Sequence, residues 1–210
     1  MKKNINIPAE NIEIKNKVKD SIFYGNISIV KNKKEAKNFI NTIKEKYDDA
    51  THNVSAYRIG EGDSALEYAD DDGEPSGSSA PPVLQAIKGE NLINTVIVVT
   101  RYFGGTKLGI GGLIRAYGDT ARKAINKAGK KNLKTAYQIK IRGNYDDIGT
   151  IMGQIESFQG KIMDTSYNNQ GVEIIAWIIP DKFDKFKSEL KEQTSAKAIL
   201  QFLEEKYILG

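Results

Sequence analysis

The sequence predicts an α+β protein built from two domains. Its 210 residues correspond to about 1.4 domains of average size, which means one large domain or two small ones. Helix-type and strand-type hydrophobic patterns alternate along the chain, and their arrangement changes at about residue 134. The charge changes at the same place: residues 1–134 carry 22 Lys and Arg against 16 Asp and Glu, whereas residues 135–210 carry 9 against 11. We therefore expect one domain over residues 1–134 and a second over residues 135–210.

The composition excludes several classes of protein. A hydrophobic content of 40% with 28% charged residues is typical of globular chains, not of disordered or fibrous ones. The absence of Cys and the single His exclude disulfides and the usual structural zinc sites. No apolar run reaches the roughly 18 residues that a membrane span requires, and the N-terminal residues have no signal-peptide core. We expect a cytoplasmic protein that does not enter a membrane and that needs no metal or cofactor.

The first expected elements are a hairpin, a helix and a strand. Residues 13–31 contain β-rich runs on both sides of Gly25-Asn26, which predicts a hairpin with its turn at this dipeptide. Residues 35–47 place apolar side chains on one face of a 3.6-residue period and predict a helix. Residues 54–59 alternate imperfectly and predict a strand.

A polar loop and a buried strand follow. Residues 69–82 are dense in Asp, Gly, Ser and Pro, so we expect a loop. Pro81-Pro82 is compatible with the first turn of a helix over residues 83–88, because proline is tolerated there. Residues 93–100, INTVIVVT, form the most apolar β-branched run in the chain and predict a buried central strand that ends at Arg101.

A glycine-rich segment connects this strand to an amphipathic helix. Glycines bend the backbone and allow a ligand to approach it, and the free N–H groups of a helix start attract anions. Neither common nucleotide motif is present: Ile110-Gly111 stands where a P-loop needs Lys-Ser/Thr, and Ile114 replaces the last Gly of the dinucleotide fingerprint. A tight turn that lets helix and strand pack closely is the alternative. The apolar stripe expected for the helix is Leu113, Tyr117, Ala121, Ala124 and Ala128.

The same segment is strongly basic. Residues 101–134 hold nine Lys and Arg against one acid, a density that a phosphate backbone favours. Arg101, Lys107 and Arg115 are the candidates to meet phosphate, while Tyr102 or Phe103 could stack on a base. A solvated helix face and ordinary core aromatic residues are the alternatives. The residues expected to form a nucleic-acid or anion-binding surface are Arg101, Tyr102, Phe103, Gly104, Gly105, Lys107, Gly111, Gly112 and Arg115.

The acidic loop suggests a different chemistry. Clustered carboxylates could act as general bases or hold Mg²⁺. The spacing does not match an EF-hand, and Gly77-Ser78-Ser79-Ala80 is not a nucleophile elbow. Ion pairs that hold the loop against Arg101 or Arg115 are the structural alternative. The residues that could form an enzyme cleft are His52, Asp71, Asp72 and Glu74, together with Arg101.

The second half of the chain has a recognisable order of elements. Asn168-Asn169-Gln170-Gly171 is a hairpin signal between two strand-type runs. The resulting order is β-α-β-β-α-β, that of a split β-α-β, ferredoxin-like domain. The elements expected are strands over residues 135–142, 161–167, 172–179 and 197–203, and helices over residues 146–158 and 181–193.

Three segments carry a resemblance to a known family: DATHNVSAYRIG, EYADDDGEPSGSSAPPVLQAI and VVTRYFGGTKLGIGGLIRAY. They resemble the IMPACT family, specifically its bacterial YigZ-type members, and RYFGG-x-KLG-x-GGL-x-RAY is highly specific. The resemblance implies that residues 1–134 form an IMPACT N-terminal domain, an α/β sandwich like the second domain of a small-subunit ribosomal protein. It implies that residues 135–210 form a second α/β sandwich, ferredoxin-like and similar to the fifth domain of elongation factor G. Ser78-Ser79-Ala80 stands where family members usually show Thr-Ala-Gly.

The resemblance also implies a role in translation. Eukaryotic members regulate translation, and the similarity to ribosomal and elongation-factor domains suggests RNA or ribosome binding. We expect a translation-associated regulatory protein with no catalytic residue, whose partner is RNA or the ribosome or a translation-related protein. Two alternatives are open. One is a hydrolase-like enzyme acting on a small phosphorylated or peptide substrate near the acidic loop; the other is a protein-interaction module, which predicts an exposed apolar patch.

Overall fold

The computed structural model describes residues 5–209 and divides the chain into two compact units, Met1–Asn132 and Leu133–Gly210. The described residues form two β-sheets and five α-helices, in agreement with the predicted α+β class. Each unit has a hydrophobic core of its own. Short 3-10 turns lie at Gly62–Ser64 in the first unit and at Tyr145–Asp147 in the second.

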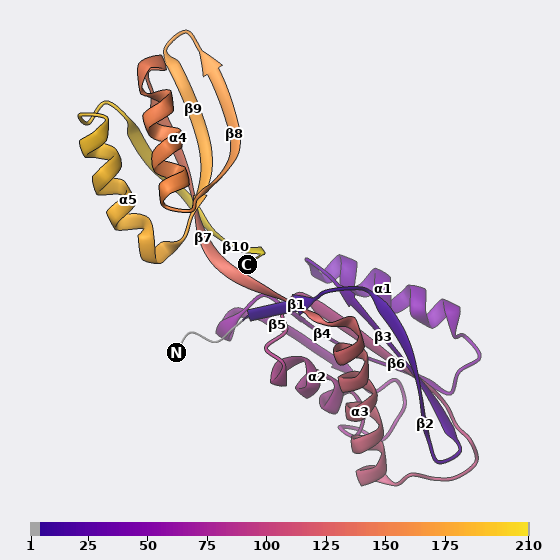
Figure 1. Ribbon diagram of the computed structural model, residues 1–210. Helices are drawn as coiled ribbons and strands as arrows, with labels where there is room; N and C mark the ends of the chain where they lie inside the picture. Colours follow the sequence, from indigo (N-terminus) through magenta and orange to yellow (C-terminus); the bar gives the residue numbers. More distant parts are fainter. Residues whose placement is uncertain (1–4, 210) are drawn as a thin grey trace. The chain divides into compact units, whose positions relative to one another are not determined.

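The first unit is organised around an antiparallel sheet with the strand order β2-β3-β6-β4-β5 (Figure 1). The strands are β2 (Ile12–Val18), β3 (Ser21–Ile29), β4 (His52–Ile59), β5 (Leu66–Asp70) and β6 (Thr95–Tyr102). The INTVIVVT run therefore supplies the central strand, as predicted. β1 (Ile5–Pro8) pairs instead with β7 (Lys130–Gly143), which begins in this unit.

Helices cover both faces of this sheet (Figure 1). Val96 and Val98 of β6 pack toward α1 (Lys33–Lys46), whereas Ile97 and Val99 pack toward α2 (Ala80–Gly89) and α3 (Ile110–Ala128). Successive side chains of a strand point to opposite faces, so a strand covered on both sides must be apolar at every position. The predicted stripe of α3 lies in the core: Leu113, Tyr117, Ala121, Ala124 and Ala128.

The helix ends follow from local sequence. Asn32 caps α1 by accepting a hydrogen bond from the Glu35 N–H, and Glu35 accepts one from the Lys31 N–H. α2 carries prolines in its first turn, where the missing N–H costs nothing, as predicted. The acidic loop begins at Asp71 because Ala69 and Asp70 belong to β5, so the predicted loop started two residues too early.

The predicted hairpin exists, but its turn lies elsewhere. β2 and β3 pair up to Val18 and Ser21, so Lys19 and Asp20 form the turn. The prediction of a turn at Gly25-Asn26 was wrong, because both residues lie inside β3. A Cβ atom on Gly25 would lie 3.1 Å from Cγ2 of Thr120. The glycine therefore allows α3 to pack closely on the strand, and its small size is a packing signal.

The second unit contains the predicted β-α-β-β-α-β order. α4 (Ile148–Ser157) and α5 (Pro180–Gln193) cover one face of its antiparallel sheet, which has the order β10-β7-β9-β8 (Figure 1). The alternate residues Ile174, Ala176 and Ile178 of β9 enter this core, as expected for a sheet with one covered face. The remaining strands are β8 (Lys161–Asn168), β9 (Gly171–Ile178) and β10 (Ile199–Leu209).

Candidate functional site

A cavity of about 400 Å³ in the first unit brings together three segments that are distant in sequence. We call it the glycine-loop pocket. It lies where β4 begins, beside the acidic loop, and along the segment that connects the end of β6 to the start of α3. The residues that line it are Thr51, His52, Glu74, Pro75, Arg101, Phe103, Lys107, Leu108, Gly109, Ile110 and Leu113.

Strand register explains why these side chains meet. Arg101 of β6 pairs with His52 of β4 on one side and with Phe23 of β3 on the other. Directly paired residues share a face of the sheet, so all three project toward α2 and α3. Side chains of β6 alternate between the two faces of the sheet, so Arg101 points to the same face as the core residues Ile97 and Val99. A charged residue thus occupies the last core position of the strand.

Glu74 neutralises this buried arginine. Nη1 of Arg101 donates to Oε1 of Glu74 at 2.7 Å, and the hydroxyl of Tyr117 donates to the same oxygen at 2.7 Å. Arg101 Nη2 also donates to Ser21 Oγ at 3.3 Å. Burial and the bond to Glu74 raise the pKa of Tyr117 well above its usual range, so the hydroxyl remains protonated. The buried charge is thereby paired and hydrogen-bonded, which its removal from water requires.

The lone histidine lies beside this pair. His52 Nδ1 is 2.8 Å from the Asp72 carbonyl oxygen, which only accepts, so Nδ1 carries the hydrogen and donates it. His52 Nε2 lies 3.9 Å from Oε2 of Glu74. In the neutral ring this nitrogen is therefore an acceptor next to a carboxylate oxygen.

Asp71 and Asp72 hold the acidic loop in shape. Asp71 accepts hydrogen bonds from the N–H groups of Gly77, Ser79 and Ala80, at 2.7, 3.0 and 2.7 Å. These bonds fix the start of α2. Asp72 is tied to the N–H of Asn53. Of the four candidate cleft residues, the structure thus brings His52 and Glu74 together, uses Asp71 within the loop and ties Asp72 to β4 and α1.

The predicted phosphate-binding residues separate into two groups. Lys107 is exposed on the pocket wall, and Arg115 is exposed on α3, where its Nη1 lies 3.6 Å from the position of a Cβ on Gly111. Arg101, in contrast, is buried and its charge is balanced by Glu74. α3 begins at Ile110, after Gly109 in the N-cap position, without a side-chain cap and without an acidic residue in its first turn. Lys107, Arg115 and the helix start therefore provide the accessible positive potential here.

The adjacent aromatic residues point in opposite directions. Phe103 lines the pocket with 45% of its surface exposed, and the guanidinium of Arg101 lies 5.4 Å from its ring centroid. Tyr102 turns away and packs edge-on against Tyr24 and Tyr47. The hydrogen bond that Tyr102 donates to Asp49 raises its pKa to about 12. Of these two adjacent aromatic residues, Phe103 is the one whose ring faces the pocket.

The glycines shape the loop that carries Phe103 and Lys107. A Cβ on Gly104 would lie 1.9 Å from the carbonyl oxygen of Asp20, so this position requires glycine for close contact with the β2–β3 turn. Gly105 has a φ of +92°, which L side chains rarely adopt. Gly111 and Gly112 lie in the first turn of α3. The glycines at 104 and 105 thus have structural roles, as the alternative of a tight turn expected.

Sequence reasoning missed three parts of the site. It treated Tyr117 as an ordinary core residue, although a Tyr in an apolar helix stripe needs a partner for its hydroxyl. It did not single out Ser21, which contacts Arg101 only through the register of β3. It also missed the apolar rim, where Ile110 is 64% exposed and Ile114 lies one turn further on the helix. Exposed apolar residues at a helix start are a signal that was available.

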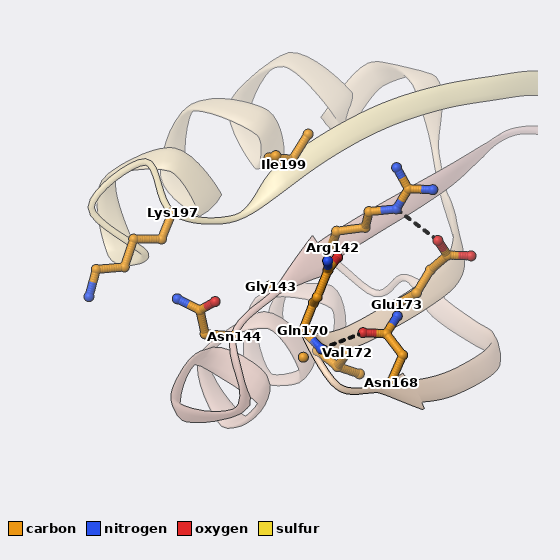
Figure 2. Close-up of a pocket in the computed structure, with 10 residues that line it drawn as sticks. Arg142, Gly143, Asn144, Asn168, Gln170, Val172, Glu173, Lys197 and Ile199 are labelled. Carbon is orange, nitrogen blue, oxygen red and sulfur yellow. Dashed lines mark hydrogen bonds and ion pairs between the residues drawn. The ribbon is translucent and has the colours of Figure 1, made fainter.

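The second unit has a pocket of about 380 Å³ at one end of its sheet (Figure 2). Backbone turns and amide side chains form much of its lining, including Asn144, Asn168 and Gln170. Arg142 donates to Glu173 at 2.8 Å, as Figure 2 shows, and Lys140 pairs with the same carboxylate at 2.7 Å. Both hydrogen bonds hold the pKa of Glu173 below its ordinary value.

Residues 5–209 lack two features. No helix in this range combines the length and the hydropathy that a membrane span requires. The same residues contain no group of three or more His, Cys, Asp or Glu side chains placed to hold a metal ion.

Comparison with known proteins agrees with this architecture. The model of the Impact N-terminal domain matches residues 19–125, which include every residue of the glycine-loop pocket. A relative from Bacillus subtilis (strain 168), "IMPACT family member YvyE", is 37% identical over 181 residues, covering 86% of this chain and 82% of that protein. The chain belongs to the IMPACT family.

The similarity within the IMPACT family extends over both units. "IMPACT family member YigZ" of Escherichia coli (strain K12) is 26% identical over 201 residues, which cover 95% of this chain and 98% of that protein. A solved structure described only as that of a hypothetical protein has a TM-score of 0.66 and 25% identity, covering 97% of this chain and 99% of that one. "Protein IMPACT" of Danio rerio matches 93 residues at 36% identity, 42% of this chain and 29% of that protein.

Proposed function

We propose that this IMPACT-family protein is a translation-associated regulatory protein that binds RNA, free or in the ribosome, through the glycine-loop pocket. The observation that carries the proposal is a combination at one open pocket and the helix beside it. The exposed base Lys107, the exposed ring of Phe103 and the uncapped start of α3 line the pocket, and a second exposed base, Arg115, lies on the same helix with its Nη1 near Gly111. Single-stranded nucleic acids are bound by such pairings of cations with an aromatic ring.

Each part has a separate task in this proposal. Lys107, Arg115 and the free N–H groups at the start of α3 contact phosphate, since all three favour negative charge. Phe103 stacks on a base with the face that Arg101 leaves open. The buried pair of Arg101 and Glu74 supports the wall on which this ring rests. Stacking tolerates every base, whereas the cations make the affinity depend on salt.

The proposal relates each part of the chain to a domain of a protein that acts in translation. Residues 1–134 act as an IMPACT N-terminal domain, similar to the second domain of a small-subunit ribosomal protein. Residues 135–210 act as a ferredoxin-like domain similar to the fifth domain of elongation factor G. The strand order β10-β7-β9-β8 supports the second assignment, because the first and third strands of the β-α-β-β-α-β unit are the central pair.

The test is a salt series of binding to labelled single-stranded RNA and to purified ribosomes. The wild type is compared with the double variant Lys107→Ala/Arg115→Ala. Each lost phosphate contact removes about 0.7 from the slope of log K against log salt, so the double variant should lose about 1.4. Arg101 is left unchanged, because its removal would leave Glu74 buried and unpaired.

A matched control removes the same charge from another place. Lys127→Ala/Lys131→Ala deletes two exposed lysines near the far end of α3 and should keep the wild-type slope. Equal slopes in all three proteins, or no binding to RNA and ribosomes, would reject the glycine-loop pocket as an RNA site.

The apolar rim supports a second candidate, a protein-interaction module. Ile110, which lines the pocket together with Phe103, is 64% exposed, and Ile114, one helical turn further, is 42% exposed. Monomeric proteins usually avoid large contiguous apolar patches. A translation-related protein with an acidic and apolar segment would suit this rim. If Ile110→Ser/Ile114→Ser abolishes ribosome binding but leaves binding to free RNA intact, the contact is with ribosomal protein.

A further inference from the structure

The inner wall of the glycine-loop pocket presents two hydrogen-bond acceptors side by side. His52 Nε2 and Glu74 Oε2 lie 3.9 Å apart, and both residues line the pocket. Arg101 and Tyr117 donate to the other carboxylate oxygen, Oε1, so they leave Oε2 on the side of the histidine. The tautomer of His52 is set by the Asp72 carbonyl, which places the lone pair of the neutral ring on Nε2.

Two adjacent acceptors are matched by a ligand group that donates two hydrogen bonds. A nitrogen with two N–H groups can form hydrogen bonds of about 2.9 Å to both atoms across this gap. The 4-amino group of cytosine and the 6-amino group of adenine are such nitrogens, and a Glu carboxylate is a usual acceptor for the cytosine amino group. Uracil carries a carbonyl oxygen at the same position, so it would bring a third acceptor against the existing two.

We infer that His52 and Glu74 make the pocket selective for a nucleobase with an exocyclic amino group, and that they reject uracil. The inference rests on the proposed RNA binding and assigns its base preference. Phe103 holds the base by stacking without discrimination, while the paired acceptors read its edge. Leaving buried acceptors unmatched is costly, so discrimination of about tenfold between cytosine and uracil is expected.

The decisive comparison uses labelled oligo(C) and oligo(U) of equal length. These probes carry the same phosphate charge and differ at the edge of a pyrimidine ring, so their affinity ratio isolates base recognition. Binding is measured by fluorescence anisotropy at about pH 8.5, since histidines change charge between about pH 5 and 8. The wild type should bind oligo(C) about tenfold more tightly than oligo(U).

Two variants test the assigned residues. His52→Asn can keep a donor to the Asp72 carbonyl while it removes the acceptor at Nε2, so the ratio should fall toward one. Glu74→Gln can keep an oxygen for Arg101 and Tyr117 while it turns Oε2 into an amide donor, so the preference should shift toward oligo(U). Circular dichroism checks that each variant is folded, and either variant is sufficient for the comparison.

The outcomes separate this inference from the proposed function. Salt-dependent binding with equal affinity for both probes would overturn the base preference and leave RNA binding standing. A cytosine preference that survives in both folded variants would place recognition elsewhere and overturn the roles of His52 and Glu74. No binding to either probe would reject the proposed function itself.

Discussion

Both pockets contain an Arg–Glu ion pair of nearly the same length, yet the pairs differ in burial. Arg101 and Glu74 are 2.7 Å apart, with 6% and 4% of their side chains exposed. Arg142 and Glu173 are 2.8 Å apart, with 59% and 22% exposed. Water screens the second pair and replaces either partner readily, whereas a partner lost from the first leaves a charge in the protein interior. The comparison shows that the distance between charges says little about their structural importance.

The same difference sets the electrostatic character of each pocket. In the second unit Glu173 binds both Lys140 and Arg142, so Lys197 is the exposed base left on the pocket wall, and the first turn of a helix does not contribute to the lining. In the first unit the buried pair is neutral as a whole. Lys107 and the start of α3 are then left to act on a ligand. An anion is therefore favoured in the glycine-loop pocket over the pocket of the second unit.

The largest expected effect is the loss of Glu74. Glu74→Ala leaves Arg101 buried without a counter-charge and should reduce the free energy of unfolding by about 3–5 kcal/mol. Urea denaturation followed by circular dichroism measures it. Glu173→Ala removes the corresponding carboxylate of the second unit and should leave the urea midpoint close to that of the wild type. Comparable losses in the two variants would contradict the distinction between the pairs.

Next in size is the hydroxyl that shares Glu74 with Arg101. Tyr117→Phe retains the ring but removes a hydrogen bond to a charged, buried acceptor, which should cost about 1.5–3 kcal/mol of unfolding free energy. Tyr167→Phe in the second unit is the control, because that ring is 59% exposed. Chemical denaturation of both variants gives the comparison, and an unchanged Tyr117→Phe protein would mean that Arg101 alone satisfies Glu74.

Most of the fold could be predicted because it follows from periodicity. The run INTVIVVT fits a strand covered on both faces, and the stripe from Leu113 to Ala128 fits a helix covered on one. These patterns depend on residues close in sequence. The turn at Lys19-Asp20 could not be found in this way, because Gly25 serves the packing of α3 nearly a hundred residues later.

The site was predictable in its residues and in one of its contacts. An ion pair between the acidic loop and Arg101 was the structural alternative, and Arg101 does bind Glu74; what the sequence did not indicate is which acid pairs, or that the pair is buried beside His52. That contact depends on strand register and on the shape that Asp71 gives to the loop. The hydrophobic alternation of a strand indicates which side chains share a face, but it does not identify the residue of β4 that lies opposite Arg101. The distinction between buried and exposed bases therefore needed the structure.

A smaller effect on stability is expected from glycine substitutions, which also differ between the two units. Gly104 in the first unit contacts the β2–β3 turn. A Cβ at this position would lie 1.9 Å from the Asp20 carbonyl oxygen, so Gly104→Ala should cost about 1–3 kcal/mol through displacement of the loop. Gly153→Ala in α4 has no neighbour within 4 Å and should stabilise the second unit by about 0.5–1 kcal/mol. Thermal melts of both variants measure the two changes in stability. A Gly104→Ala variant with the wild-type Tm would show that the loop moves away from the turn at no cost.

The smallest expected effect concerns acid stability near the glycine-loop pocket. Burial raises the pKa of Asp72, but hydrogen bonds from Lys44 and the Asn53 N–H outweigh it and hold this pKa below its ordinary 3.8. A lowered pKa in the folded state stabilises the fold above the unfolded value, and this contribution is lost as the pH falls through the folded pKa. Asp72→Asn should therefore be less stable than the wild type at pH 7 by about 1 kcal/mol or less, with the difference shrinking below pH 3.8. Urea midpoints at both pH values measure it, and a difference that grows in acid would show that the carboxylate is not held in its charged form by these contacts.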